Sequence, residues 1–136
     1  MQKFKELDLL SINELLHDDE KMIRDSVRKW VDDAVLPIIE EQYQKAEFPI
    51  QLVPQMGEMG LLGSNLPEKY GCAGINNVAY GLIMQELERG DSGLRSFASV
   101  QGAAKNRSQR TILQATGEQG SGQGPPSLAE KRCDVF

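Results

Sequence analysis

The chain has 136 residues and a formal net charge of -5, with 15 Lys and Arg against 20 Asp and Glu. This length allows one modest core but not a two-domain cofactor enzyme, so one domain is the most that we expect. The acidic balance argues against nucleic acid or an anionic membrane as a partner. No stretch approaches the roughly 20 apolar residues of a membrane span, and the first residues lack the apolar core of an export signal.

The cysteines and the histidine indicate no metal site. Cys72 and Cys133 are far apart and form no C-x-x-C, so the sequence predicts neither a disulfide framework nor a zinc site, and a reducing compartment fits. His17 is the only histidine, which excludes a His-based metal cluster.

A long helical pattern starts at Asp18 and continues to about Glu47. The acids that follow His17 suit a helix start, because short acceptors and negative charge are favoured there. Pro37 lies inside the pattern and lacks an N–H, so we expect a kink or a break there. Apolar residues at steps of three and four trace one helix face: Ile23, Val27, Trp30, Val31, Val35, Ile38 and Ile39.

Two shorter helices are expected after Phe48-Pro49. The first carries Leu52, Met56 and Met59 on its apolar stripe, tolerates Pro54 in its first turn and stops near Gly60. Residues 61–75 show no sustained period and predict an ordered loop. The second helix starts at Asn76 or Asn77, where Asn is a good cap, and ends near Arg89. Its stripe holds Ala79, Ile83 and Leu87.

The character of the sequence changes after residue 101. Residues 102–136 contain five of the 13 glycines and few large apolar residues, and their net charge is +2 against -7 for residues 1–100. Such a segment cannot offset the entropy of ordering it. We therefore expect an all-α domain at 1–101 and a Gly/Gln-rich, mostly disordered tail at 102–136, with a helical turn at most around 110–114.

The end of the last predicted helix gathers acids, arginines and glycines in residues 86–96. Gly90 and Gly93 would let the backbone turn sharply and approach a ligand. Arg95 could present its planar fork to a carboxylate, with Glu88 close enough to tune it. On composition alone, an exposed helix end with surface ion pairs is the better interpretation.

Four stretches together resemble the N-terminal helical domain of acyl-CoA dehydrogenases. They are MGEMGLLG (56–63), PEKYGCAG (67–74), ELERGDSG (86–93) and LRSFASVQG (94–102). The resemblance covers about residues 8–102 and is closest to the glutaryl-CoA dehydrogenase branch. It implies a flavoenzyme with a helical N-terminal domain, a middle β-domain and a C-terminal four-helix domain, with FAD between the last two.

The resemblance also implies a reaction and a set of partners. In the family a glutamate of the C-terminal domain removes the α-proton while a hydride leaves for FAD, and the glutaryl branch then loses carbon dioxide to give crotonyl-CoA. Arg95 would bind the distal carboxylate of glutaryl-CoA, Ser96 would support it, and Glu88 would share the pocket. Complete members are expected to be homotetramers that reduce an electron-transfer flavoprotein, in the bacterial cytoplasm or, in a eukaryote, in the mitochondrial matrix.

The sequence departs from the family after Gly102, where AAKNRSQRTILQATG replaces the expected apolar helix. No flavin segment and no catalytic glutamate is recognisable, so the flavin-binding residues are unknown and this chain should be inactive alone. We interpret it as a truncated glutaryl-CoA-dehydrogenase-like protein, and hypothesise that the tail is translated out of frame. Two alternatives stay open: a non-catalytic helical interaction module, and the N-terminal domain of another acyl-CoA dehydrogenase branch.

Overall fold

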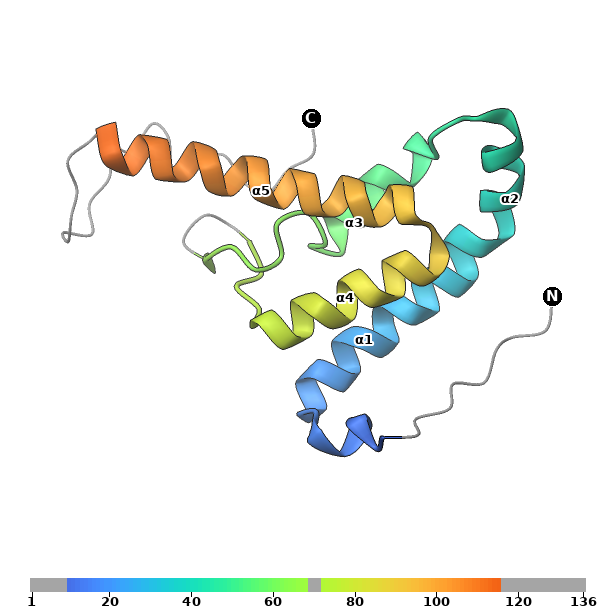
Figure 1. Ribbon diagram of the computed structural model, residues 1–136, viewed down its shortest axis with the longest axis horizontal. Coiled ribbons are helices and arrows are strands. Elements are labelled where there is room, and N and C mark those ends of the chain that lie inside the picture. Colours follow the sequence, from blue (N-terminus) through green and yellow to red (C-terminus); the bar gives the residue numbers. More distant parts are fainter. Residues whose placement is uncertain (1–9, 69–71, 116–136) are drawn as a thin grey trace.

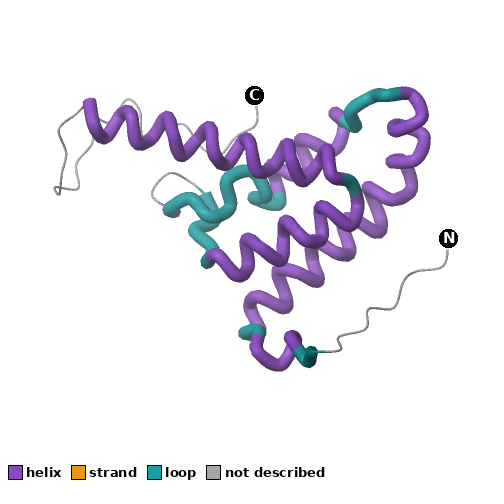
Figure 2. The backbone as a smooth tube through the Cα atoms, viewed as in Figure 1, coloured by secondary structure: helices purple, strands orange, loops and turns teal. Residues whose placement is uncertain are grey.

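The computed structural model describes residues 10–68 and 72–115, with 105–115 described by their backbone alone. This part of the chain consists of helices and loops and has no strand, which confirms the all-α fold class (Figures 1 and 2). The elements in chain order are η1 (Ile12–Leu15), α1 (Asp18–Trp30), η2 (Val31–Val35), α2 (Leu36–Lys45), η3 (Ile50–Leu52), α3 (Val53–Glu58), α4 (Asn77–Gly90) and α5 (Ser92–Ala115). No described helix is both long and apolar enough to cross a membrane.

Helices α1 and α4 lie side by side and run in the same direction, and α5 returns over them towards the start of α4 (Figure 1). The side chain of Asn76 donates to Glu20 near the first turns of both helices, and Arg28 reaches Glu86 farther along. A parallel helix pair needs a long connection, which here contains α2, α3 and the loop after it. In Figure 1 α3 lies behind α5, and the loop after α3 passes between α5 and α4.

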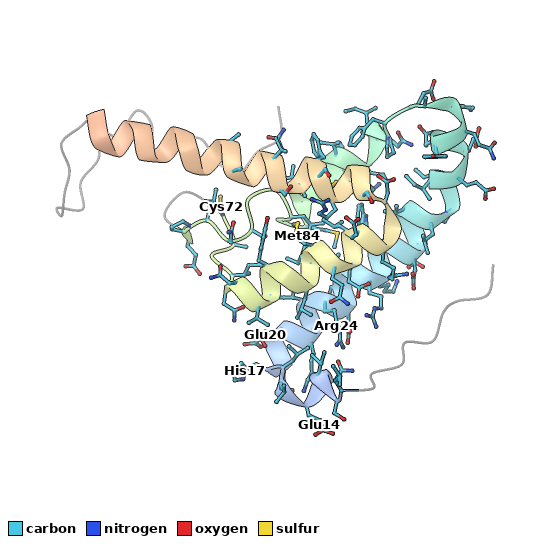
Figure 3. All side chains as sticks on the ribbon, in the orientation of Figure 1. Glu14, His17, Glu20, Arg24, Cys72 and Met84 are labelled. Carbon is cyan, nitrogen blue, oxygen red and sulfur yellow. The ribbon has the colours of Figure 1, made fainter. Side chains whose placement is uncertain are left out.

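The start of α1 is capped as the sequence predicts. The N–H of His17 donates to Glu20 Oε2 at 2.9 Å, and His17 and Glu20 lie together at the end of the helix (Figure 3). Such a reciprocal cap satisfies amides that have no partner inside the helix. At α4 the side chain of Asn76 accepts from the N–H of Ala79 at 2.8 Å, which confirms the predicted cap there.

The interruption expected at Pro37 occurs one turn earlier. Residues Val31–Val35 form a π-helical turn, closed by the N–H of Leu36 donating to the carbonyl of Val31. A proline ring crowds the carbonyl four residues before it, and a wider turn relieves that contact. The chain then continues as α2 instead of ending.

The core forms where the predicted stripes of α1, α3 and α4 meet α5. Met56, Leu87 and Leu94 are fully buried, whereas Met59 is 37% exposed and so lies outside the core, contrary to its predicted place on the stripe. The buried apolar cluster consists of Val27, Val31, Val35, Leu52, Met56, Leu61, Leu62, Ile83, Leu87, Leu94 and Ala98.

Helix α3 and the loop after it follow the sequence prediction. Proline stands in the first turn of α3, and Gly60 adopts φ 69°, a left-handed conformation that favours glycine at a helix end. Backbone hydrogen bonds hold the described part of the loop, among them those from Gly74 to Leu66 and from Ile75 to Ser64.

Helix α5 corrects the predicted start of the disordered tail. It continues through Gly102 to Ala115, so the chain is helical where the sequence predicts only a turn around 110–114. Residues 103–115 contain Ala, Lys, Arg, Gln and Leu, which have high helix propensity, and one glycine does not end such a helix. The rest of the predicted tail, 116–136, lies outside the described residues.

The prediction that the chain has no disulfide framework involves Cys133, which lies outside the described residues.

A buried carboxylate fixes α4 against α1. Glu86 is 1% exposed, and its two oxygens pair with Arg28 Nη2 at 2.5 Å and with Arg89 Nε at 2.9 Å. Arg89 also pairs with Asp32 at 2.9 Å. Burial alone would raise the pKa of Glu86, but the hydrogen bonds and charges of the two arginines outweigh burial and lower it. The sequence offered one signal for this residue, a charge next to Leu87 inside an apolar stripe.

Alanine substitutions at Gly90 and Gly81, which lie in the same helix, should change the free energy of unfolding in opposite directions. A Cβ at Gly90 would lie 2.8 Å from Val31 Cγ1, whereas a Cβ at Gly81 meets nothing within 4 Å. Gly90→Ala should therefore lower the free energy of unfolding by about 1 to 3 kcal/mol. The matched control Gly81→Ala should raise it by about 0.5 to 1 kcal/mol, because alanine restricts the unfolded chain and favours helix. Urea unfolding followed by circular dichroism measures both, and equal effects would contradict the close contact at Gly90.

The Glu86 cluster predicts an acid-sensitive contribution to stability. Folding lowers the pKa of Glu86, so its stabilisation is complete above the pKa of an unfolded glutamate, about 4.3, and is lost as pH falls through the lower folded pKa. Glu86→Gln should lower the free energy of unfolding by about 3 kcal/mol at pH 7, since it breaks a buried ion pair. The difference from the wild type should shrink below pH 4. Glu58→Gln, a control at an exposed position, should change the free energy of unfolding little. A loss of stability in Glu86→Gln that stays constant with pH would refute this account.

Candidate functional site

The candidate site lies at the junction between α4 and α5, which are separated by one residue. Asp91 has φ -164° and ψ 130°, an extended conformation between two helices. Its N–H donates to the carbonyl of Leu87 at 2.8 Å, and its Oδ2 accepts from the N–H of Leu94 at 2.8 Å. Asp91 therefore ends α4 and caps α5, so it fixes where α5 begins.

The two glycines of the junction do not act as the sequence predicts. Neither Gly90 nor Gly93 adopts a positive φ, so neither makes the sharp turn expected of it. Gly90 instead allows α4 to approach Val31 and Val35 closely. Arg95 consequently stands on the first turns of a regular helix and not on a flexible loop.

Arg95 and Glu88 lie in contact across the junction. Arg95 Nε donates to Glu88 Oε2 at 2.7 Å, and the two side chains are 38% and 48% exposed. The other carboxylate oxygen, Oε1, accepts from Ser92 Oγ at 2.7 Å. The hydrogen bond from Arg95, and after it the one from Ser92, lower the pKa of Glu88 below its ordinary value.

The terminal nitrogens of Arg95 remain open in the described part of the chain. The side chain makes its hydrogen bond and its ion pair with Glu88 through Nε. An arginine presents five N–H donors in a planar fork, so the two Nη atoms can still donate side by side. That edge has the geometry for a bidentate contact with a carboxylate.

Ser96 is placed differently from the other two predicted residues. It is half-buried on α5, and successive helical residues point about 100° apart, so it does not share the face of Arg95. Among the described residues its side chain forms no hydrogen bond with Arg95 or Glu88, whereas its carbonyl accepts from Ser99 Oγ at 3.0 Å. The structure therefore brings Arg95 and Glu88 together and leaves Ser96 apart.

A groove of about 510 Å³ borders the same junction. Asp91 and Gly93 form one side of it, and the end of α2 with Phe48 and Pro49 forms the other. Phe48 also stacks at a tilt on Phe97, with ring centroids 5.2 Å apart. The residues that line the groove are Ile39, Gln42, Tyr43, Ala46, Glu47, Phe48, Pro49, Asp91 and Gly93. The groove thus adjoins the site, although Arg95 does not line it.

The sequence alone does not indicate a role for two residues of this site, Asp91 and Ser92. Asp91 offered the usual signal of a cap, an Asp just before a helix, but no helix was predicted after it. Ser92 offered only its spacing of four residues from Glu88, which becomes a contact when both helices are known.

The chain is similar to known proteins over most of its length. The family "Acyl-CoA dehydrogenase, N-terminal domain" matches residues 17–119, which extends beyond the resemblance noted up to residue 102. Among curated proteins, the chain is 34% identical over 87 residues to the probable acyl-CoA dehydrogenase YngJ of Bacillus subtilis, covering 62% of this chain and 23% of that protein. It is 32% identical over 85 residues to the mitochondrial short-chain specific acyl-CoA dehydrogenase of Bos taurus, covering 62% and 21%.

Two solved structures of glutaryl-CoA dehydrogenase from Mycobacterium smegmatis are also similar. One, in complex with FADH2, is 45% identical with a TM-score of 0.65, covering 68% of this chain and 24% of that chain. The other is 42% identical with a TM-score of 0.66, covering 91% and 31%.

The chain thus spans about a quarter of the length of the relatives it matches. Its helical fold and most of its sequence match one domain of them, and it belongs to the acyl-CoA dehydrogenase family, whose N-terminal domain it contains.

Proposed function

We propose that this chain supplies the carboxylate-recognising wall of the acyl pocket in a glutaryl-CoA dehydrogenase. The observation that carries the proposal is the open Nη edge of Arg95, held beside Glu88 at the start of α5. The similarity to glutaryl-CoA dehydrogenase structures at 42–45% identity supports the choice of substrate.

The reaction proposed for the whole protein is the FAD-dependent α,β-dehydrogenation of glutaryl-CoA, followed by decarboxylation to crotonyl-CoA. FAD accepts the hydride when bound. In this proposal FAD and the base that removes the α-proton belong to parts of the enzyme beyond the described residues, and an electron-transfer flavoprotein reoxidises the homotetramer. Arg95 would bind the distal carboxylate, Glu88 would orient Arg95, and Ser96 would border the pocket.

The charge on Arg95 explains how such a wall selects a dicarboxylic acyl chain. A bidentate arginine and carboxylate pair is a strong, directional contact. A fatty acyl chain of the same length ends in a methyl group, which leaves the guanidinium without a partner once the pocket closes around it. Sites built on such polar pairs reject substrates that lack the partner by large factors.

The isolated chain should be inactive. A purified sample is expected to show no absorbance from bound flavin and no reduction of an electron acceptor with glutaryl-CoA. Spectrophotometry of the purified protein, with the enzyme of M. smegmatis as a positive control, measures both. If the isolated chain bound flavin and oxidised glutaryl-CoA, this would contradict the proposal that FAD and the base belong to other parts of the enzyme.

Substitution of Arg95 tests the substrate in an active context. Residues 17–101 can replace the matching segment of the M. smegmatis enzyme. In that chimera, Arg95→Ala should lower kcat/KM for glutaryl-CoA by about 100-fold or more and change that for butyryl-CoA little. Arg95→Lys should recover only part, because an ammonium cannot donate as a fork. Lys29→Ala, which removes an exposed cation on α1, is the matched control.

An unchanged preference for glutaryl-CoA over butyryl-CoA in Arg95→Ala would exclude the binding role of Arg95. It would favour the open alternative of another acyl-CoA dehydrogenase branch with a different acyl chain.

A second candidate is an interaction module. Two large apolar side chains that line the groove are exposed, Tyr43 at 82% and Phe48 at 41%, as is Ile50, which follows Pro49 in the chain, at 67%. Grouped apolar exposure marks surfaces that associate with other chains. Size-exclusion chromatography with light scattering and partner capture together test this candidate, because a strictly monomeric chain that captures no partner would leave it without support.

A further inference from the structure

Arg95 and Glu88 form the proposed carboxylate clamp, and Ser92 donates a hydrogen bond to Glu88 beside it. We propose that Ser92 is a positioning residue, which anchors one oxygen of Glu88 so that Glu88 occupies only the Nε side of Arg95. This inference rests on the proposed function and adds to it the element that keeps the ligand-binding edge free.

The geometry joins three side chains in a row. Ser92 Oγ lies 2.7 Å from Glu88 Oε1, and Arg95 Nε lies 2.7 Å from Glu88 Oε2. Each carboxylate oxygen therefore has its own donor. Because both donors belong to the first turn of α5 and Glu88 belongs to the last turn of α4, the row crosses the helix junction.

The hydroxyl of Ser92 is not needed for ending or starting a helix. Asp91 already caps α5, through its contact with the N–H of Leu94, and already closes α4 through its own N–H. Ser92 is exposed and stands at the first position of α5. Its hydroxyl donates to the side chain of Glu88, whereas Asp91 makes the two contacts with backbone groups at the helix ends.

Loss of the hydroxyl would change how Glu88 uses Arg95. With Oε1 released, the carboxylate can rotate and accept from Nε and an adjacent Nη together, which is the preferred fork geometry of this pair. An intramolecular carboxylate would then compete with the distal carboxylate of a ligand for the guanidinium. Ser92 thus sets whether the clamp is open, and does so without touching the ligand.

The first experiment uses the full chain and needs no substrate. The Nε–Hε signal of Arg95 and the carboxyl carbon of Glu88 are followed by NMR across a pH titration in the wild type, Ser92→Ala and Ser92→Thr. Ser92→Ala should shift the Arg95 signals and the Glu88 titration, and Ser92→Thr should restore both because it keeps the hydroxyl. Ser26→Ala is the control, since Ser26 is an exposed helical serine that donates to the carbonyl of Met22. Unchanged signals in Ser92→Ala would overturn the proposed contact.

The second experiment measures function in the chimera described above. Ser92→Ala should raise KM for glutaryl-CoA by about five- to tenfold, as expected for one lost hydrogen bond to a charged group that acts indirectly, with kcat and the kinetics with butyryl-CoA unchanged. The effect should disappear when Glu88 is already Ala, because Ser92 acts through the carboxylate of Glu88. An equal effect in both backgrounds, or none in the wild-type background, would refute the positioning role.

The outcomes separate this inference from the proposed function. If Arg95→Ala abolishes the glutaryl preference but Ser92→Ala changes nothing, Ser92 has no positioning role and the proposed function stands. If Arg95→Ala itself leaves the preference unchanged, the proposed function fails and the positioning role fails with it.

Discussion

The buried carboxylate of Glu86 is the constraint from which the arrangement of this domain follows. A charge that is 1% exposed must be paired, and its two oxygens are met by arginines from α1 and from the end of α4 itself. These contacts set the register between the two helices. Gly90 then permits close approach of α4 to Val31, and Asp91 breaks the helix at the next residue. The direction of α5, and with it the place of Arg95, follows from that break.

Much of this fold could be predicted because its signals are local. The apolar spacing of α1, the cap at Asn76 and the left-handed Gly60 each act within one helical turn. The extent of α5 could not be predicted in this way, because residues 103–115 have helix propensity without an apolar stripe, and an apolar stripe is the main sequence signal of a helix. The place of the interruption near Pro37 was also one turn off, since the strain of a proline is relieved before it and not at it.

In the site, too, contacts between residues near in the sequence could be predicted, whereas contacts that depend on the arrangement of helices could not. The proximity of Glu88 and Arg95 was expected from a helix end that carries both, and the two side chains are in contact. Their binding roles, and that of Ser96, stay predictions. The contact of Ser92 with Glu88 depends on a one-residue break between two helices, which cannot be placed without knowing that a second helix follows. The sequence alone indicates no role for Glu86 in joining two helices, because its partner Arg28 lies 58 residues away.

The π-helical turn at Val31–Val35 has a consequence for the groove beside the junction. Such a turn holds one residue more than a regular turn of α-helix, and each helical residue adds about 100° of rotation. Removing one residue from this segment would restore a regular helix and rotate α2 by that angle. Ile39, Gln42, Tyr43 and Ala46 would then leave the groove wall and other side chains of α2 would take their place. The phase of α2, and so the chemical character of that wall, is set by a single inserted residue more than one helical turn away from it.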